Sequence, residues 1–286
     1  MKSQDPNQEH LQSIINLYTE GQMQLALSES SQMLERFPNS VILFNIAGAS
    51  NAALMQFDAA IESYKQALRI KPDYADAYYN MGVALNDKGD PEAAIESYKQ
   101  ALRINPDYFK AYNNMGVALN DKSDPEAAIE SYKQALRINP DYADAYNNMG
   151  VALNDNGDPE TAIESYKQAL RINPDYADAY NNMGSALKDK GDLEEAIDNY
   201  KQALRIKPDY AEGYSNLGAA QLLLNHTEQA IASYEKAISL KKDLKIAISG
   251  LGMVLLKKGE HSDGLDKLRH GDGSILFNIK SGISIK

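Results

Sequence analysis

The sequence predicts an all-α protein, an α-solenoid of about seven helix-turn-helix repeats of 34 residues that ends in a short β-like C-terminal tail. The first observation is a series of five prolines spaced 34 residues apart, Pro72, Pro106, Pro140, Pro174 and Pro208. The second is that residues 75–108 and 143–176 are identical at 31 of 34 positions. A strict period of this length is typical of arrays in which each unit packs only on its neighbours.

The period divides the chain into consecutive segments. We expect a degenerate N-terminal repeat at 7–40, six regular repeats, a degenerate C-terminal capping repeat at 245–272 and a strand-like tail at 273–286. The six regular repeats are 41–74, 75–108, 109–142, 143–176, 177–210 and 211–244. The two end repeats lose the pattern, as expected of terminal units that lack a neighbour on one side.

The pattern within each regular repeat predicts two helices joined by a turn. In residues 75–108 the apolar and small residues of the first half recur at helical offsets and share one face; they are Tyr78, Met81, Gly82 and Leu85. Asp90-Pro91-Glu92 predicts the start of the second helix, with Asp90 as N-cap and Pro91 at the first helical position. The expected buried stripe of that helix is Ala94, Ile95, Tyr98, Ala101 and Leu102. We expect Pro106-Asp107 to end the repeat and cap the next helix.

These residues resemble the tetratricopeptide repeat. The resemblance is carried by Tyr78-x2-Met81-Gly82-x2-Leu85, Ala94-x3-Tyr98, Ala101 and Pro106. The same pattern recurs in phase in the other regular repeats, and the likeness covers roughly residues 7 to 270. It implies a right-handed superhelix of helix pairs.

The last residues of the chain have a different period. Alternation of apolar and polar residues in 274–280 and 283–286 predicts two strands around Ser281-Gly282. Such a hairpin could pack on the last helix, begin a further domain, or pair with another copy through its open edge to form a homo-oligomer. The sequence leaves these three roles open.

Composition excludes several kinds of site. The chain has no cysteine, so disulfides and thiolate metal sites are excluded. Its four histidines lie in dissimilar contexts, and we expect no metal, no cofactor and no catalytic residue. The polar N-terminus and the lack of an apolar run of about 18 residues predict neither a signal peptide nor a membrane anchor, and hence a cytoplasmic protein with no membrane partner.

Charge is unevenly distributed along the chain. The net charge is -11. Residues 75–210 contain 24 acidic and 14 basic residues, whereas residues 245–286 contain 4 acidic and 7 basic residues. Affinity for phosphates needs a clustered cationic surface, so the acidic repeats argue against nucleic acid as a partner.

One face of the first helices is predicted to bind a ligand. It lies opposite the packing stripe and carries an asparagine at the same place in five successive repeats, Asn80, Asn114, Asn148, Asn182 and Asn216. An amide both donates and accepts, so such a row can pair with the backbone of an extended peptide. Three neighbouring asparagines are included in the predicted site, Asn113, Asn147 and Asn181.

The five-residue series resembles the asparagine ladder in the tetratricopeptide portion of O-linked N-acetylglucosamine transferase. In that family the ladder lies on the concave wall and holds the substrate backbone. The preceding repeat here departs from the pattern, with Ile46 at that place. A simpler interpretation is that near-identical repeats copy any tolerated residue, and that some amides only bridge neighbouring helices.

A second row on this face is acidic and consists of Asp87, Asp121, Asp155 and Asp189. Chaperone-binding tetratricopeptide domains, which this chain resembles in its asparagines, instead use lysines or arginines to clamp a terminal carboxylate. The acidic row argues against such a clamp. We therefore expect an extended peptide with neutral or basic side chains.

The function predicted from the sequence is that of a non-enzymatic scaffold, which binds extended segments of partner proteins in a groove lined by asparagine and aspartate. Two alternatives remain open. The chain could recruit substrates as the repeat region of a larger enzyme such as a glycosyltransferase. It could also assemble head to tail into fibres, since a contact that does not close propagates.

Overall fold

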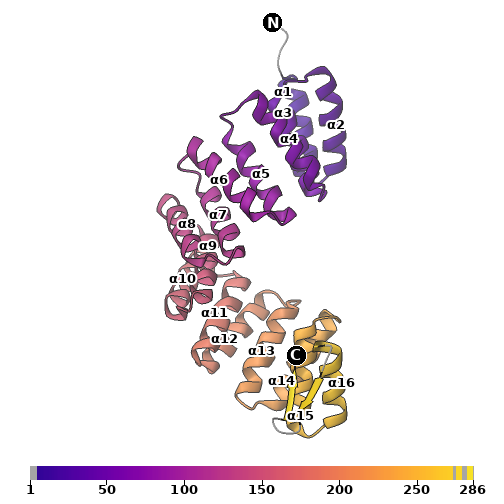
Figure 1. Cartoon of the computed structure of the whole chain (residues 1–286), viewed down its shortest axis with the longest axis vertical. Coiled ribbons are helices and arrows are strands. Elements are labelled where there is room, and N and C mark those ends of the chain that lie inside the picture. Colours follow the sequence, from indigo (N-terminus) through magenta and orange to yellow (C-terminus); the bar gives the residue numbers. More distant parts are fainter. Residues whose placement is uncertain (1–4, 273–274, 279–281, 286) are drawn as a thin grey trace. The chain divides into compact units, whose positions relative to one another are not determined.

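The computed structural model of the chain describes residues 5–272, 275–278 and 282–285 (Figure 1). These residues form sixteen α-helices and one pair of strands, and they divide into two compact units between Asp141 and Tyr142. The helices of the first unit are α1 (Gln8–Thr19), α2 (Met23–Arg36), α3 (Val41–Ala53), α4 (Phe57–Ile70), α5 (Ala75–Lys88), α6 (Pro91–Ile104), α7 (Phe109–Asp121) and α8 (Pro125–Ile138). Those of the second unit are α9 (Ala143–Asp155), α10 (Pro159–Ile172), α11 (Ala177–Lys190), α12 (Leu193–Ile206), α13 (Ala211–Leu223), α14 (Thr227–Leu240), α15 (Lys245–Lys258) and α16 (His261–Asp272).

Each unit is a stack of four helix pairs. In both units every odd-numbered helix packs on the next even-numbered helix, which in turn packs on the first helix of the following pair. The all-α repeat fold is therefore confirmed. The described residues hold eight pairs rather than about seven, because both degenerate end segments also fold into pairs. None of the described helices has the length and apolar composition needed to cross a bilayer.

The second helices of the most regular repeats begin as predicted. Asp90 Oδ1 accepts a hydrogen bond from the Ala93 N–H at 3.1 Å, and Pro91 occupies the first helical position. The equivalent N-cap bonds of α8 and α10 are 3.2 Å and 3.1 Å long. A cap of this kind satisfies an N–H group that would have no partner within the helix.

The prediction that Asp107 caps the next helix is wrong. The N-cap of α7 is Tyr108, so Asp107 lies one residue before the capping position. The backbone N–H of Asp107 instead donates to Asn105 Oδ1 at 3.2 Å, which closes a local turn after the proline. The Pro-Asp dipeptide therefore ends a repeat without capping the next one.

A tyrosine and a glycine form the centre of each regular pair. The predicted stripe of α6 is buried throughout, and Tyr98 and its counterparts Tyr132, Tyr166 and Tyr200 are almost fully enclosed. A Cβ atom placed on Gly150 would lie 2.6 to 2.9 Å from ring carbons of Tyr166. The glycine is therefore required for the aromatic ring of the second helix to pack directly on the backbone of the first.

The strand-like tail forms a hairpin. β1 (Ile275–Asn278) pairs antiparallel with β2 (Gly282–Ile285), with Ile275 opposite Ile285, and β1 lies against α16. The strands confirm the predicted change of period. The other tail residues assigned to strands or to the turn, 274, 279–281 and 286, lie outside the described residues.

Alkaline pH is expected to destabilise the protein through the buried tyrosines of the second helices, such as Tyr200 and Tyr234. Burial raises the pKa of Tyr234 to about 12, and burial raises that of Tyr200 to about 12 although a hydrogen bond with Ser185 opposes the shift. An unfolded chain loses the phenolic proton near pH 10, before the folded chain does. Stability should therefore be constant below about pH 10 and should fall as the pH rises toward 12.

Denaturant midpoints measured from about pH 8 to pH 12 test this expectation. The Tyr200→Phe/Tyr234→Phe variant should lose less stability across the alkaline limb than the wild-type chain. Equal losses in the two proteins would show that these hydroxyls do not control the transition.

Candidate functional site

The structure places the predicted residues on consecutive first helices. Asn80 and Asn114 lie on α5 and α7 of the first unit, and Asn148, Asn182 and Asn216 lie on α9, α11 and α13 of the second. All five are half-buried. The four aspartates of the acidic row lie near the C-terminal ends of α5, α7, α9 and α11 and are exposed.

The amides of the second unit form a continuous hydrogen-bonded chain, which we call the amide chain. Its members are Asn148, Asn147, Asn182, Asn181 and Asn216. Asn147 Nδ2 donates to Asn148 Oδ1 at 3.4 Å, and Asn182 Nδ2 donates to Asn147 Oδ1 at 3.1 Å. Asn181 Nδ2 donates to Asn182 Oδ1 at 3.4 Å, and Asn216 Nδ2 donates to Asn181 Oδ1 at 3.0 Å. The chain thus links α9, α11 and α13, which also contact one another in that order.

In the first unit a tyrosine interrupts this pattern. Asn113 Nδ2 donates to Asn114 Oδ1 at 3.1 Å, but Asn114 Nδ2 donates to the Tyr79 hydroxyl, at 3.2 Å. Asn80 Nδ2 donates to Asn45 Oδ1 at 3.2 Å. The Tyr79 ring lies 4.9 Å from that of Tyr108, centre to centre. The two units therefore hold their half-buried asparagines in different surroundings.

Three of the predicted site residues are buried between helices. Asn113, Asn147 and Asn181 are only 4%, 6% and 6% exposed. Each donates to the neighbouring asparagine on its own helix. Asn147 and Asn181 also accept a hydrogen bond from an asparagine of the next first helix. The sequence placed all eight asparagines on a ligand-facing surface. The structure instead buries these three. Asn147 and Asn181 bridge first helices, as the simpler interpretation allowed for some amides.

The acidic row lies close to the central tyrosines of the pairs. Burial, and then the charge of Asp155, raises the pKa of Tyr166, and Tyr132 is affected in the same way by burial and Asp121. Asp189 also contacts Lys188 Nζ at 3.4 Å and accepts from Asn154 Nδ2 at 3.4 Å. The row is therefore a set of exposed carboxylates of which the last is partly neutralised by a neighbouring lysine.

Sequence reasoning missed a set of tyrosine–aspartate pairs. The Tyr108 hydroxyl donates to Asp76 Oδ1 at 2.9 Å, joining the end of one repeat to the start of its first helix. Burial, followed by the charge and hydrogen bond of Asp144, raises the pKa of Tyr176, and Tyr210 is related to Asp178 in the same way. The signal was present, because Pro-Asp-Tyr ends five successive repeats.

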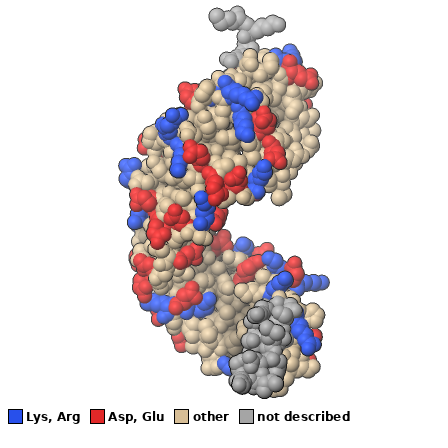
Figure 2. Space-filling model, in the orientation of Figure 1, with Lys and Arg blue, Asp and Glu red and all other residues tan. Residues whose placement is uncertain are grey.

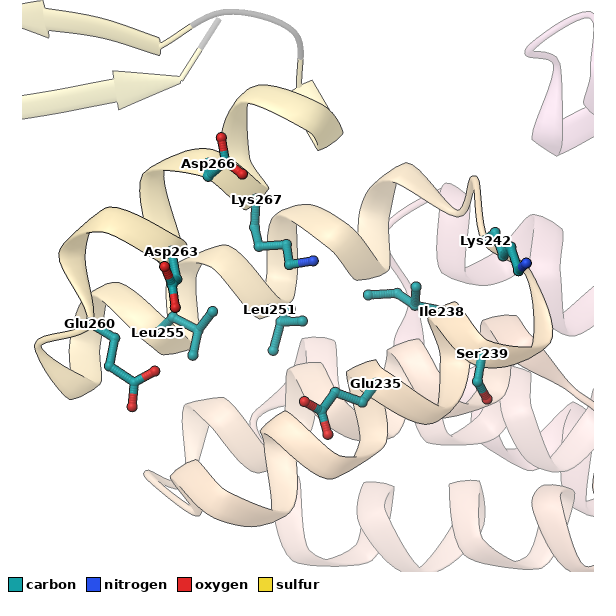
Figure 3. Close-up of a pocket in the computed structure, with 10 residues that line it drawn as sticks. All are labelled: Glu235, Ile238, Ser239, Lys242, Leu251, Leu255, Glu260, Asp263, Asp266 and Lys267. Atoms are coloured by element: carbon teal, nitrogen blue, oxygen red, sulfur yellow. The ribbon is translucent and has the colours of Figure 1, made fainter.

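Two cavities lie away from the predicted residues. One, of about 680 Å³, is lined by α4, α5 and α6 in the first unit. The other, of about 720 Å³, lies between α14, α15 and α16 (Figure 3). Its lining combines Leu251, Leu255 and Ile238 with carboxylates that include Glu235 and Asp263. Neither lining, as described, includes a predicted site residue.

Charged side chains of both signs are interspersed over the face shown in Figure 2. Several form ion pairs between neighbouring helix pairs, such as Lys88 Nζ with Asp58 Oδ1 at 2.6 Å and Lys122 Nζ with Glu92 Oε1 at 3.0 Å. These exposed pairs contribute little to stability.

Comparison with known proteins supports the repeat assignment. The pattern described as TPR repeat matches residues 54–89, 118–157, 152–191 and 184–225. Patterns described as tetratricopeptide repeat match 75–108, 97–130 and 211–244. One curated relative, the probable UDP-N-acetylglucosamine--peptide N-acetylglucosaminyltransferase SEC of Arabidopsis thaliana, is 34% identical over 76 residues. The match covers 27% of this chain and 8% of that protein.

Solved structures share the fold. The APC/C hetero-tetramer Cut9-Hcn1 contains a chain with a TM-score of 0.72 and 18% identity, covering 87% of this chain and 49% of that one. MamA has a TM-score of 0.53 and 32% identity over 58% of this chain and 96% of its own. YrrB, described as a TPR protein with an unusual peptide-binding site, has a TM-score of 0.51 and 23% identity over 66% of this chain and 97% of its own. The chain belongs to the tetratricopeptide repeat family.

Proposed function

We propose that this repeat protein is a non-enzymatic scaffold that binds an extended segment of a partner protein along its first helices. The observation that carries the proposal is the amide chain, which fixes Asn148, Asn182 and Asn216 in orientation. Fixed side chains lose little conformational entropy when a ligand binds. A row of such amides suits a peptide backbone, which offers N–H and C=O groups at a regular spacing.

Asn182 has hydrogen-bonding capacity left for such a ligand. Among the described residues it donates once, to Asn147, and accepts once, from Asn181. A carboxamide has two N–H donors and two acceptor lone pairs. One donor and one acceptor therefore remain, which is the set needed to pair with one peptide unit.

The buried amides have a supporting role in this proposal. Asn147 and Asn181 bond the half-buried asparagines on either side and do not reach the ligand. The acidic row then selects among ligands, since exposed carboxylates favour neutral or basic side chains and repel acidic ones. The twelve residues of the predicted site thus divide into ligand-contacting amides, positioning amides and selective acids.

Loss of partners from a double variant tests the proposal. We expect Asn148→Ala/Asn182→Ala to weaken binding at least about tenfold, because the truncations remove hydrogen bonds to the ligand worth about 0.5 to 1.5 kcal/mol each, and a tenfold change equals about 1.4 kcal/mol. Partners are captured from an extract of the source cells and quantified by mass spectrometry. Thermal unfolding of both proteins checks that the variant remains folded.

Asn156→Ala is the matched control, since Asn156 is an exposed asparagine at the C-terminal end of the same helix as Asn148. This variant should retain every partner. If the double variant retained them as well, the amides would only bridge helices and the proposed site would be wrong.

A second candidate function is the recruitment of protein substrates for a glycosyltransferase domain elsewhere in a longer protein. The 76-residue match to the transferase SEC favours it. The mass of the native protein in its source cells decides between the two. A mass equal to that of this chain would exclude the larger enzyme, whereas a much larger mass together with transferase activity would support it.

A further inference from the structure

The ligand-facing side of the first helices changes from polar to apolar at the C-terminal end of the second unit. Three of the exposed large apolar residues lie there: Leu223 at the end of α13, and Ile246 and Met253 on α15, with exposed fractions of 58%, 67% and 44%. Exposed apolar side chains that gather on one side of a molecule commonly mark a binding surface. We call these three residues the apolar end patch.

The patch continues the row that contains the amide chain. Ile246, Gly250, Met253 and Lys257 recur on α15 at offsets of four, three and four residues, which aligns them along one side of the helix. The same places on α11 hold Asp178, Asn182, Ser185 and Asp189. Ile246 and Met253 thus replace an acid and a hydroxyl. Gly250 replaces the amide, and Lys257 replaces the second acid. Since α15 packs on α13, which carries Asn216, the patch lies next to the last member of the amide chain.

The amide row ends at Gly250, where the ring of Tyr234 packs on the helix backbone. A Cβ atom at this place would lie 2.4 Å from ring carbons of Tyr234, so the ring occupies the space that a side chain would take. The apolar side chains on either side of Gly250 do not complete the core, because Leu251 and Leu255 do so on the other side of the helix, at the cavity of Figure 3. Met253 stands two residues from Leu251, about 200° away around the helix axis.

The charge at the C-terminal end of the patch is positive. The first turn of α15 has no acidic residue, and its last turn carries Lys257 and Lys258. Lys257 Nζ donates to Asn225 Oδ1, which holds it next to the end of α13. Lys258 Nζ is paired with Glu260 Oε1 at 2.9 Å. A ligand that continues from the acidic row onto α15 therefore passes from a negative to an apolar and then to a positive surface.

We propose that the apolar end patch is a second subsite, which binds apolar side chains followed by a carboxylate in the same extended partner segment. This inference rests on the proposed function, because the amide chain has to hold the backbone that leads into the patch. The recognised segment then has two parts. A neutral or basic part lies along α9 and α11, and an apolar part with an adjacent acidic residue lies along α13 and α15.

Synthetic peptides test the two parts of the recognised segment separately. The first fluorescent peptide alternates serine and lysine. The second peptide adds a leucine-leucine-glutamate block at its N-terminal end, and the third adds the same block at its C-terminal end. Comparison of the two shows in which direction the peptide chain runs along the helices. Fluorescence polarisation with the full chain is expected to show about tenfold tighter binding for one of the two block peptides than for the first peptide.

The variant Ile246→Asp/Met253→Ser places on α15 the residues that α11 has at the same positions. It should bind the first peptide as the wild-type chain does and lose the gain from the block. Leu25→Ser, which changes an exposed apolar residue on α2 of the first unit, should keep the gain.

The possible failures are distinguishable. If no peptide binds, the proposed function is contradicted. If the serine–lysine peptide binds but neither block adds affinity, or if the gain survives in Ile246→Asp/Met253→Ser, only the subsite is contradicted. If that variant changes only the sedimentation of the unliganded protein, the patch is a contact between two copies or with the chain's own tail, and the proposal is wrong.

Discussion

Replacing Tyr166 with alanine is expected to lower the free energy of unfolding of the second unit by about 3 to 5 kcal/mol, the usual cost of truncating a buried aromatic residue. Tyr166 is 2% exposed and its ring lies directly over the backbone of α9 at Gly150. The cavity left behind borders both helices of one pair. The result should be a lower midpoint in denaturant, measured by circular dichroism.

Tyr166→Phe is the control for that measurement. It keeps the ring and removes only the hydroxyl, whose pKa is raised chiefly by burial. Its midpoint should stay close to that of the wild-type chain. A loss as large as that of Tyr166→Ala would show that the hydroxyl, rather than the packing of the ring, stabilises the pair.

Replacing Gly150 with leucine is expected to destabilise the same pair from the opposite side, by about 1 to 3 kcal/mol or more, because overpacking forces side chains and backbone to shift. The first added carbon alone would lie 2.6 Å from the Tyr166 ring. Thermal unfolding measures the effect. An unchanged midpoint would mean that the two helices do not cross at this glycine.

A double-mutant cycle links the two predictions. In Gly150→Leu/Tyr166→Ala the new side chain enters the space that the ring has left, so the two losses should not add. Residues in contact show interaction energies of about 0.5 to 3 kcal/mol. Additive losses would contradict direct contact between these two positions.

The fold could be predicted because the helices of every regular repeat pack in the same way. The spacing of Pro106 and its counterparts, together with Gly82 and Tyr98, recurs at 34 residues, so one interpretation of a single repeat serves for all of them. Asp90-Pro91 marked a helix start correctly because an N-cap bond depends only on neighbours in the chain. Asp107 was misassigned because the exact residue at which α7 begins depends on the turn after the proline.

The site could be predicted only in part. Periodicity identified the side of the helix that carries Asn148 and Asn182, since helical phase follows from the sequence. Asn147 and Asn181 stand one residue earlier, about 100° away around the helix axis, and this difference decides whether the amide is buried or accessible. The Tyr176–Asp144 relation was missed because its members lie far apart in the sequence and meet only when a repeat closes on its own first helix.

The sequence by itself determined the repeat length, the two helices in each repeat, the core residues of the second helices and the rows of amides and acids, because all of these follow from local propensity and from a strict period. Only the tertiary structure decided which amides bond each other, which are buried, and where the row ends at Gly250 against the ring of Tyr234. Those properties depend on the distance between side chains of different repeats, which the periodic sequence leaves undefined until the helices pack.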